Sequence, residues 1–218
     1  MFKESIVNKI KQGKFLPAPH GYPKNMYDIN SESYRTIEFN DIDWTDSVVI
    51  FGCSNVFGNI DDDNNTLSTQ LQEMINTPVI NMGVCASSME FSFFNNMILK
   101  NNYPIPKAVV NVWTSIDRTT SYLRDKVINH GSWSPNEIYN VYNETHSNPE
   151  VHAIMMQLIT KQIWIEKTQY YECTFFNRTA KLLNIYQQEY VDRATDNIHP
   201  GRKTTYNLAI KIKKELCL

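Results

Sequence analysis

Three residues of this sequence, Ser54, Asp196 and His199, have the types and the spacing that acyl-transfer chemistry requires. Ser54 comes just after Gly52 at the end of a short apolar run, where the chain must turn sharply and glycine is best tolerated. Asp196 precedes His199 by three residues, so within one turn its carboxylate can reach Nδ1 of the imidazole. That contact fixes the tautomer whose Nε2 can take a proton from a serine hydroxyl, and serine needs such a base to become a nucleophile.

Other interpretations of these residues stay open from the sequence. Ser54 could be the N-cap of a helix that follows a strand. Asp196 could cap a turn, and His199 could be an ordinary surface histidine. Asp192 is a rival partner for the histidine, although four residues earlier it points elsewhere unless the loop folds back. Cys53 offers a thiol beside Ser54, but neighbouring residues at a strand end face opposite ways, so we expect a thiol in the core.

Three apolar runs, 47–51, 78–82 and 108–113, read as strands that are buried on both faces of a parallel sheet. Between them, apolar residues at helical spacing predict helices around 67–75 and 91–98, with N-caps at Asn65 or Thr66 and at Ser87 or Ser88. This alternation predicts βαβ units with right-handed crossovers. Ligands of such sheets bind beyond the carboxyl ends of the strands, so the loops after these three runs should converge on one crevice.

The remaining segments are less regular. Apolar residues predict a helix around 151–159, and 182–190 fits either a helix or the last strand. An amphipathic helix is expected at 206–216, with its lysines in water. We expect residues 1–46 to form an N-terminal arm packed on the domain, and 47–218 to form one domain with an insertion around 119–190.

The loop motifs together resemble the SGNH (GDSL-like) hydrolase superfamily, in the variant whose first block reads Gly-Cys-Ser. The resemblance covers about residues 47–118 and 192–216, and it rests on Ser54, on Gly83 of the Asn-Met-Gly block, and on the D-x-x-H block of Asp196 and His199. The G-x-S-x-G elbow of α/β-hydrolases is not matched, because Val56 replaces its second glycine.

This resemblance implies an α/β fold, a flavodoxin-like three-layer α/β/α sandwich around a mostly parallel sheet of about five strands. It also implies that Ser54 is the nucleophile, His199 the base and Asp196 the residue that orients His199. The backbone N–H groups of Ser54 and Gly83 would then form most of the oxyanion hole. No metal and no organic cofactor is implied.

The third block departs from the family pattern. Where the family has G-x-N-D, with an asparagine that completes the oxyanion hole, residues 113–116 read Trp-Thr-Ser-Ile. Ser115, or failing that Thr114, takes the asparagine position. A hydroxyl is a less preorganised donor than an amide, and losing one oxyanion donor lowers the rate by about 10²–10³-fold. The departure is compatible with a slow enzyme, a different substrate geometry or an inactive protein.

Two further side chains are candidates for substrate binding. Trp113, together with Trp133 and Tyr122, could form a wall on which a sugar stacks, although aromatic residues are as often part of the core. Arg118, just beyond the third block, could hold a substrate anion through its guanidinium group or form a structural ion pair.

The composition excludes several classes of protein. Among the 218 residues, 21 Lys and Arg face 23 Asp and Glu, and a net charge of −2 is too even for a nucleic-acid-binding surface. The four cysteines form no C-x-x-C pair, and the acidic run 61–63 lacks the spacing of a calcium loop, so no metal site is predicted. No segment resembles a signal peptide or a membrane span. We expect a cytoplasmic protein without a membrane partner, or a virion component assembled in the cytoplasm.

Two functions are compatible with these observations. The first is a serine esterase that hydrolyses a small acyl ester, such as an O-acetyl group on carbohydrate, without a cofactor. Acyl transfer to another hydroxyl would use the same residues. The second is a catalytically weak or inactive module of the same fold that binds glycans or serves in assembly. In both cases the expected partner is a small molecule or a glycan.

Overall fold

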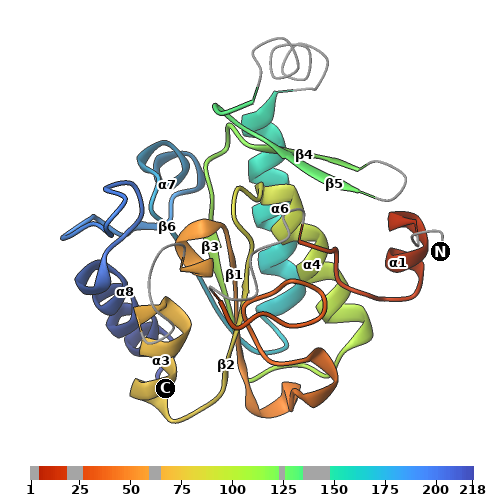
Figure 1. Cartoon of the computed structure of the whole chain (residues 1–218), viewed down its shortest axis with the longest axis horizontal. Helices are drawn as coiled ribbons and strands as arrows, with labels where there is room; N and C mark the ends of the chain where they lie inside the picture. Colours follow the sequence, from red (N-terminus) through yellow and green to blue (C-terminus); the bar gives the residue numbers. More distant parts are fainter. Residues whose placement is uncertain (1–4, 19–26, 59–64, 123–125, 135–147) are drawn as a thin grey trace.

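Figure 1 shows the computed structural model of the chain, which describes residues 5–18, 27–58, 65–122, 126–134 and 148–218. Within these residues, one parallel sheet has the strand order β2-β1-β3-β6-β7. Its strands are β1 (Val48–Gly52), β2 (Val79–Gly83), β3 (Ala108–Trp113), β6 (Gln169–Thr174) and β7 (Tyr186–Gln187).

Helices cover both faces of this sheet (Figure 1). On one face lie α3 (Leu67–Ile75) and α8 (Arg202–Glu215), and on the other lie α4 (Met89–Asn102) and α6 (Pro149–Trp164). The shorter helices are α1 (Ile6–Lys11), α2 (Ser54–Phe57) and α7 (Asn177–Leu183), with 3₁₀ turns at Phe39–Asp41 and Trp44–Asp46. The predicted α/β fold, a three-layer α/β/α sandwich, is confirmed.

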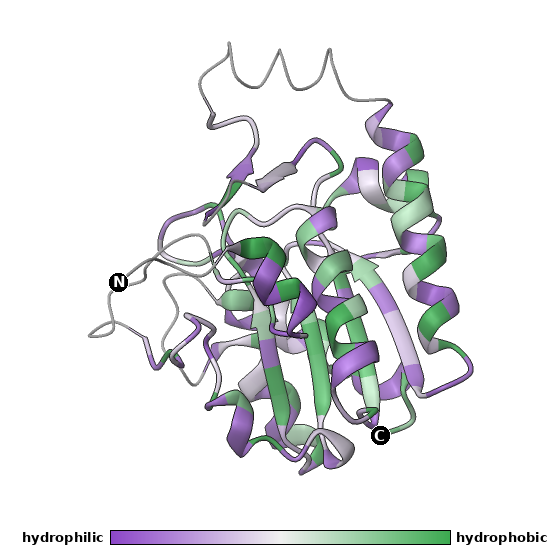
Figure 2. Ribbon diagram, turned by 90° about the vertical axis from the view of Figure 1, so that its right-hand side faces the viewer, coloured by the Kyte–Doolittle hydropathy of each residue, from purple (hydrophilic) through white to green (hydrophobic). Residues whose placement is uncertain are grey.

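The alternation of side chains along β1 explains the two apolar layers. Val48 and Ile50 belong to the cluster under α3 and α8, whereas Val49 and Phe51 belong to the cluster under α4. Figure 2 shows the central strands in green, between helices that carry both green and purple residues. A strand covered by helices on both sides must be apolar throughout, and this is why the predicted runs have no polar alternation.

The predicted helix starts after β1 and β2 are confirmed. The hydroxyl of Thr66 accepts the backbone N–H of Thr69 at 3.1 Å and caps α3. Ser88 caps α4 in the same way, accepting the N–H of Phe91 at 3.2 Å. Each hydroxyl satisfies a backbone donor that the first helical turn leaves without a partner.

The segment 119–190, expected as an insertion, contributes to the main sheet. It supplies α6 and β6, and β6 pairs in parallel with β3 from Ala108↔Gln169 to Trp113↔Thr174. The segment 182–190 holds the end of α7 and the short strand β7, so both predicted alternatives are found there. Apart from this sheet stands a hairpin, β4 (Thr119–Tyr122) with β5 (Val127–His130), near the start of α4 (Figure 1).

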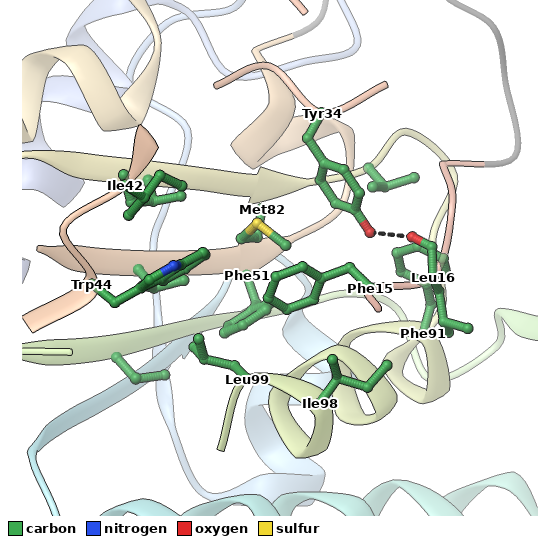
Figure 3. Packing of buried hydrophobic residues seen from close by; sticks show 14 of the residues in the cluster. Phe15, Leu16, Tyr34, Ile42, Trp44, Phe51, Met82, Phe91, Ile98 and Leu99 are labelled. Carbon is green, nitrogen blue, oxygen red and sulfur yellow. Dashed lines mark hydrogen bonds between the residues drawn. The ribbon is translucent and has the colours of Figure 1, made fainter. Parts of the chain in front are cut away.

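The described parts of residues 1–46 pack over the α4 side of the sheet. Phe15, Leu16 and Tyr34 are buried there in the cluster of Phe51 (Figure 3). The hydroxyl of Tyr34 donates to the carbonyl of Leu16 at 2.5 Å, and the side chain of Asn95 on α4 accepts the N–H of Leu16 at 2.9 Å. Burial raises the pKa of Tyr34, which therefore stays a neutral donor.

The parallel arrangement brings the loops after the strands to one edge of the sheet. Gly52 of β1 lies opposite Gly83 of β2 and Val112 of β3 in the register. The chain segments that follow these residues therefore meet at the carboxyl edge, where ligands bind in sheets of this kind. Residues 188–201, which follow β7, leave the sheet at the same edge because β7 is also parallel.

Candidate active site

Ser54 is the first residue of the single-turn helix α2 at the end of β1. The N-cap of that helix is Cys53, so Ser54 is not the helix N-cap that the sequence allowed as an alternative to the nucleophile. Cys53 is 1% exposed and a free thiol in the core, as expected, whereas Ser54 retains 8% exposure. Ser54 is thus held in a tight turn at the carboxyl edge of the sheet.

Two glycines allow α2 to lie directly on the strand ends. A Cβ at Gly83 would be 2.4 Å from the backbone nitrogen of Phe57 and 2.8 Å from the carbonyl carbon of Val56. A Cβ at Gly52 would be 3.0 Å from the carbonyl oxygen of Val112. Both positions require the absence of a side chain, which explains why glycine ends both strands.

Asp196 and His199 form the predicted pair. Oδ2 of Asp196 lies 2.5 Å from Nδ1 of His199, and Oδ1 accepts the backbone N–H groups of Ile198 at 3.0 Å and His199 at 3.1 Å. The two side chains are about 15% exposed. This contact assigns the proton to Nδ1 and leaves Nε2 as the acceptor of the neutral imidazole.

The surroundings of Asp196 keep it ionised. Burial acts to raise its pKa, but the hydrogen bonds from the His199 ring and from the two backbone N–H groups outweigh that effect and lower the pKa to about 2. A carboxylate that carries its charge throughout the neutral range can stabilise an imidazolium that forms beside it.

Asp192, the rival partner, has a different role. Its carboxylate accepts the backbone N–H groups of Lys203 at 3.0 Å and Thr204 at 2.8 Å, and the hydroxyl of Thr204 at 2.7 Å. It thereby satisfies the first turn of α8, whose N-cap Gly201 has no side chain to do so. Asp192 anchors the loop on α8 and does not contact His199 through any of these bonds.

Tyr190 lies between the C-terminal loop and the turn that carries Ser54. Burial raises the pKa of its hydroxyl most strongly, and the Cys53 thiol adds to the rise, while the polar side chain of Asn55 opposes it. These interactions place the hydroxyl beside the two neighbours of Ser54. Sequence reasoning missed Tyr190, because nothing in its local pattern reveals a contact with residues far away in the chain.

The N–H of Gly83, predicted to help form the oxyanion hole, is already engaged. It donates to Oδ1 of Asn81 at 2.9 Å, and Nδ2 of Asn81 donates in turn to the carbonyl of Val56 at 2.9 Å. Gly83 therefore serves the packing of α2 on β2, and the prediction that its N–H is a free donor needs correction. The turn that follows, 84–87, is closed by the N–H of Ser87 to the carbonyl of Val84 at 3.1 Å.

Ala86 in that turn was not singled out from the sequence. Its φ is +60°, a conformation that costs a residue with a Cβ about 1–2 kcal/mol. The turn is tied to β1, since the N–H of Val84 and the hydroxyl of Ser87 both donate to the carbonyl of Gly52, at 3.0 Å and 3.1 Å. A non-glycine residue held at positive φ beside the end of β1 is a feature that composition and spacing do not reveal.

The two hydroxyls of the third block differ in their partners. Oγ of Ser115 donates to Oδ2 of Asp117 at 3.1 Å. Oγ1 of Thr114, a residue that is 2% exposed, has no hydrogen-bond partner among the residues the structure describes. Of the two candidates, Thr114 thus has the hydroxyl without a hydrogen-bond partner in the described residues, although the match to the family block puts Ser115 first.

Trp113 is a core residue and not part of a substrate wall. It is 1% exposed, and its indole N–H donates to Oε2 of Glu172 at 3.1 Å. The sequence could not distinguish this position from an exposed one, because the acceptor of the indole N–H comes from β6, a strand far away in the chain. Of the other two aromatic candidates, Trp133 is 49% exposed, and Tyr122 packs edge-on against Phe94 with ring centres 5.3 Å apart.

Arg118 lies in the turn after β3. Its backbone N–H donates to the carbonyl of Ser115 at 3.2 Å, and its guanidinium group lies over the rings of Trp133 and Phe176. The carboxylate next to it in sequence, Asp117, forms its ion pair with Arg178 at 2.6 Å.

Among the residues described, no group of three or more His, Cys, Asp or Glu side chains could hold a metal ion. The acidic run 61–63 lies outside the described residues. None of the helices in the described ranges is long and apolar enough to cross a membrane.

Comparison of the fold with solved structures gives matches of low sequence identity. An acetyl xylan esterase from the rumen bacterium Butyrivibrio proteoclasticus aligns over 81% of this chain and 66% of its own, with 8% identity and a TM-score of 0.49. A protein assigned to the lipolytic G-D-S-L family from Desulfitobacterium hafniense aligns over 79% of this chain and 100% of its own, with 13% identity and a TM-score of 0.48.

A third structure, a member of the lipolytic G-D-S-L family from Veillonella parvula, aligns over 78% of this chain and 97% of its own, with 10% identity and a TM-score of 0.44. No family model matches the sequence, and no curated protein matches it. The functional argument therefore rests on the residues of the chain itself.

Proposed function

We propose that this protein is a serine esterase. The observation that carries the proposal is the Asp196–His199 pair. The carboxylate of Asp196 accepts hydrogen bonds from Nδ1 of His199, at 2.5 Å, and from two backbone N–H groups. This pair belongs to the segment after β7, and Ser54 belongs to the turn after β1, so both come from the carboxyl edge of one parallel sheet.

The reaction follows from the chemistry of these three groups. Oγ of Ser54 attacks the carbonyl carbon of the ester while Nε2 of His199 takes the hydroxyl proton. Asp196 stabilises the imidazolium, which then gives its proton to the departing alcohol as the carbon–oxygen bond breaks. Water, deprotonated by His199, attacks the acyl carbon, the bond to Oγ of Ser54 breaks, and His199 returns the proton to Oγ as the acid is released. No metal or organic cofactor takes part in this sequence.

The negative oxygen of the tetrahedral intermediate needs hydrogen-bond donors that are in place beforehand. The backbone N–H of Ser54 is one, and the uncommitted Oγ1 of Thr114 is the second. The hydroxyl of Ser115 and the N–H of Gly83 have other acceptors, so we assign them no primary role. The turn 84–87, fastened to the carbonyl of Gly52, follows β2 at the same edge of the sheet.

The sequence resemblance favours small acyl esters, including O-acetyl groups on carbohydrates, as substrates. Acyl transfer to a second alcohol in place of water would use the same residues. The proposal is tested by the turnover of p-nitrophenyl acetate by the wild type, Ser54→Ala and His199→Ala. We expect hydrolysis that either substitution lowers by at least about 10³-fold, and equal rates in the three proteins would refute the proposal.

A second function is favoured by one observation. The third block offers a threonine hydroxyl where the family has an amide, and a hydroxyl is a weaker oxyanion donor. The same fold could therefore act as a glycan-binding or assembly module. Binding of a glycan that Ser54→Ala leaves unchanged, by a wild type without any esterase activity, would favour this function over the first.

A further inference from the structure

The guanidinium group of Arg118 lies over two aromatic rings. Its Cζ lies 5.0 Å from the ring centre of Trp133 and 5.4 Å from that of Phe176. Rings at these distances favour a cation electrostatically and shield it from water. They restrict the guanidinium group without occupying its N–H donors, which lie in its own plane.

One of those donors is buried and unused. Nη1 of Arg118 has no hydrogen-bond partner in the ranges that the structure describes. A buried charged donor without an acceptor is unfavourable, because it has lost its water and gained nothing in exchange. A ligand that supplies an acceptor at this point would remove the penalty.

The nearby carboxylates are engaged with another arginine. Asp117 pairs with Arg178 at 2.6 Å, and Glu150 pairs with the same guanidinium group at 2.9 Å. Asp117 also accepts the hydroxyl of Ser115 at 3.1 Å. Within the described part of the chain, the structural ion pair considered for Arg118 is therefore formed by Arg178 in its place.

Arg118 and Ser54 lie at the same edge of the sheet, because Arg118 follows β3, Ser54 follows β1, and these two strands are parallel neighbours. Burial raises the pKa of Tyr190, and the charges of Arg193 and Arg118 both act to lower it, so both cations lie within electrostatic reach of its hydroxyl. Cζ of Arg193 is 4.4 Å from the centre of the Tyr190 ring. Two cations, Arg193 and Arg118, therefore lie near Tyr190, which belongs to the segment after β7.

We propose that Arg118 binds a carboxylate of the substrate, so that the preferred substrates are acyl esters that carry a carboxylate group. This inference rests on the proposed esterase function. A carboxylate is planar and presents two acceptors to the fork of a guanidinium group, and the contacts with the two rings restrict the movement of that fork. The carboxylate belongs either to the alcohol, as in an O-acetylated uronic acid, or to the acyl group, as in a hemisuccinate.

The test compares esters that differ in the carboxylate alone. For the alcohol side, O-acetylated galacturonic acid is compared with O-acetylated galactose, and for the acyl side, p-nitrophenyl hemisuccinate with p-nitrophenyl butyrate. We expect the wild type to prefer the carboxylate-bearing member of one pair. Arg118→Gln should lower that preference, measured as a ratio of kcat/KM values, by about 10- to 100-fold, the usual effect of a lost charge-assisted hydrogen bond. Arg118→Lys should restore part of it.

Arg178→Gln is the matched control, because it removes the same charge from a nearby guanidinium group whose carboxylate partners are known. It should leave the ratio unchanged. A wild type that hydrolyses both members of each pair equally, with turnover lost in Ser54→Ala, would overturn the carboxylate inference and leave the esterase function intact.

Binding provides a second readout that does not need turnover. Ser54→Ala is titrated with galacturonate and with succinate, and galactose serves as the neutral reference. Binding of one of these anions that Arg118→Gln weakens about 10-fold or more, in the same Ser54→Ala background, supports the inference even if no ester is hydrolysed. Absence of any binding that depends on Arg118 would overturn it.

Discussion

Thr114, which we propose as an oxyanion donor, lies in the block where the sequence departs from the family pattern. Thr114 is 2% exposed, and its hydroxyl has no partner among the described residues. A buried hydroxyl without a partner is unfavourable in the resting protein, and it becomes favourable when a negative oxygen forms next to it. Such a group stabilises the transition state more than the ground state.

Replacing Thr114 with valine tests this role, because valine keeps the shape and removes the hydroxyl. We expect kcat/KM for p-nitrophenyl acetate to fall by about 10²-fold, the effect of one lost oxyanion donor. The free energy of unfolding should stay equal or rise slightly, since no hydrogen bond of the resting protein is lost. Ser115→Ala is the control, and an effect on kcat/KM larger than that of Thr114→Val would assign the donor to Ser115.

The Asp196 carboxylate gives a prediction about pH. Its pKa in the folded protein, about 2, lies below the value of about 3.9 for an unfolded chain. The ionised form therefore stabilises the fold fully above about pH 4, and this contribution is lost as the pH falls through about 2. Urea denaturation should show that Asp196→Asn is less stable than the wild type at pH 6 and that the difference narrows at pH 3. A difference in stability between the two proteins that widens on acidification would contradict a lowered pKa of Asp196 in the folded protein.

Individual residues of the site were predictable where the spacing along the chain determines the contact. The Asp196–His199 pair is three residues apart and could be read from the sequence alone. The roles of Trp113 and Gly83 could not, because each depends on an acceptor whose geometry only the folded chain defines, Glu172 for one and Asn81 for the other.

At the scale of elements, the start of α8 holds the loop that carries the Asp–His pair. The carboxylate of Asp192 accepts two backbone N–H groups of the first turn and the hydroxyl of Thr204. The N–H of Gly201 donates to the carbonyl of Asp192 at 3.2 Å, and Arg193 forms a β-bridge with Pro200. These contacts close the loop between Asp192 and Gly201 at its base, and this restricts the position of His199.

Asp192→Ala should destabilise the protein without removing the chemistry. Loss of the carboxylate at the start of α8 should lower the free energy of unfolding by about 1–2 kcal/mol, the usual effect of losing a helix cap. Urea denaturation at neutral pH measures this. At a temperature where the variant is folded, we expect kcat to fall far less than in Asp196→Ala, and an equal loss in the two variants would make Asp192 a functional partner of His199.

The elements themselves were predictable in the first half of the chain. β1, β2 and β3 are apolar because helices cover both their faces, and α3 and α4 have serine or threonine caps that can be read directly. Strand β6 escaped prediction because its sequence contains Glu172. That carboxylate is 10% exposed and accepts hydrogen bonds from Trp113, Gln157 and Tyr170, partners that no local pattern reveals.

At the scale of the whole molecule, the parallel sheet concentrates the candidate groups at one edge. Ser54 follows β1, Thr114 follows β3, and the Asp–His loop follows β7. The described parts of residues 1–46 pack their aromatic side chains over the α4 side of the sheet and do not supply any of these groups (Figure 3). The central claim is therefore that Ser54 is an activated nucleophile at this edge.

The most direct test is the intact mass of the protein after incubation with a fluorophosphonate, which reacts with serines that a neighbouring base activates. The wild type is compared with Ser54→Ala and His199→Ala, and each protein is first shown to be folded by its melting curve. We predict one adduct on the wild type and none on either variant. An unmodified, folded wild type, or an adduct that persists in Ser54→Ala, would contradict the assignment of Ser54 as the nucleophile.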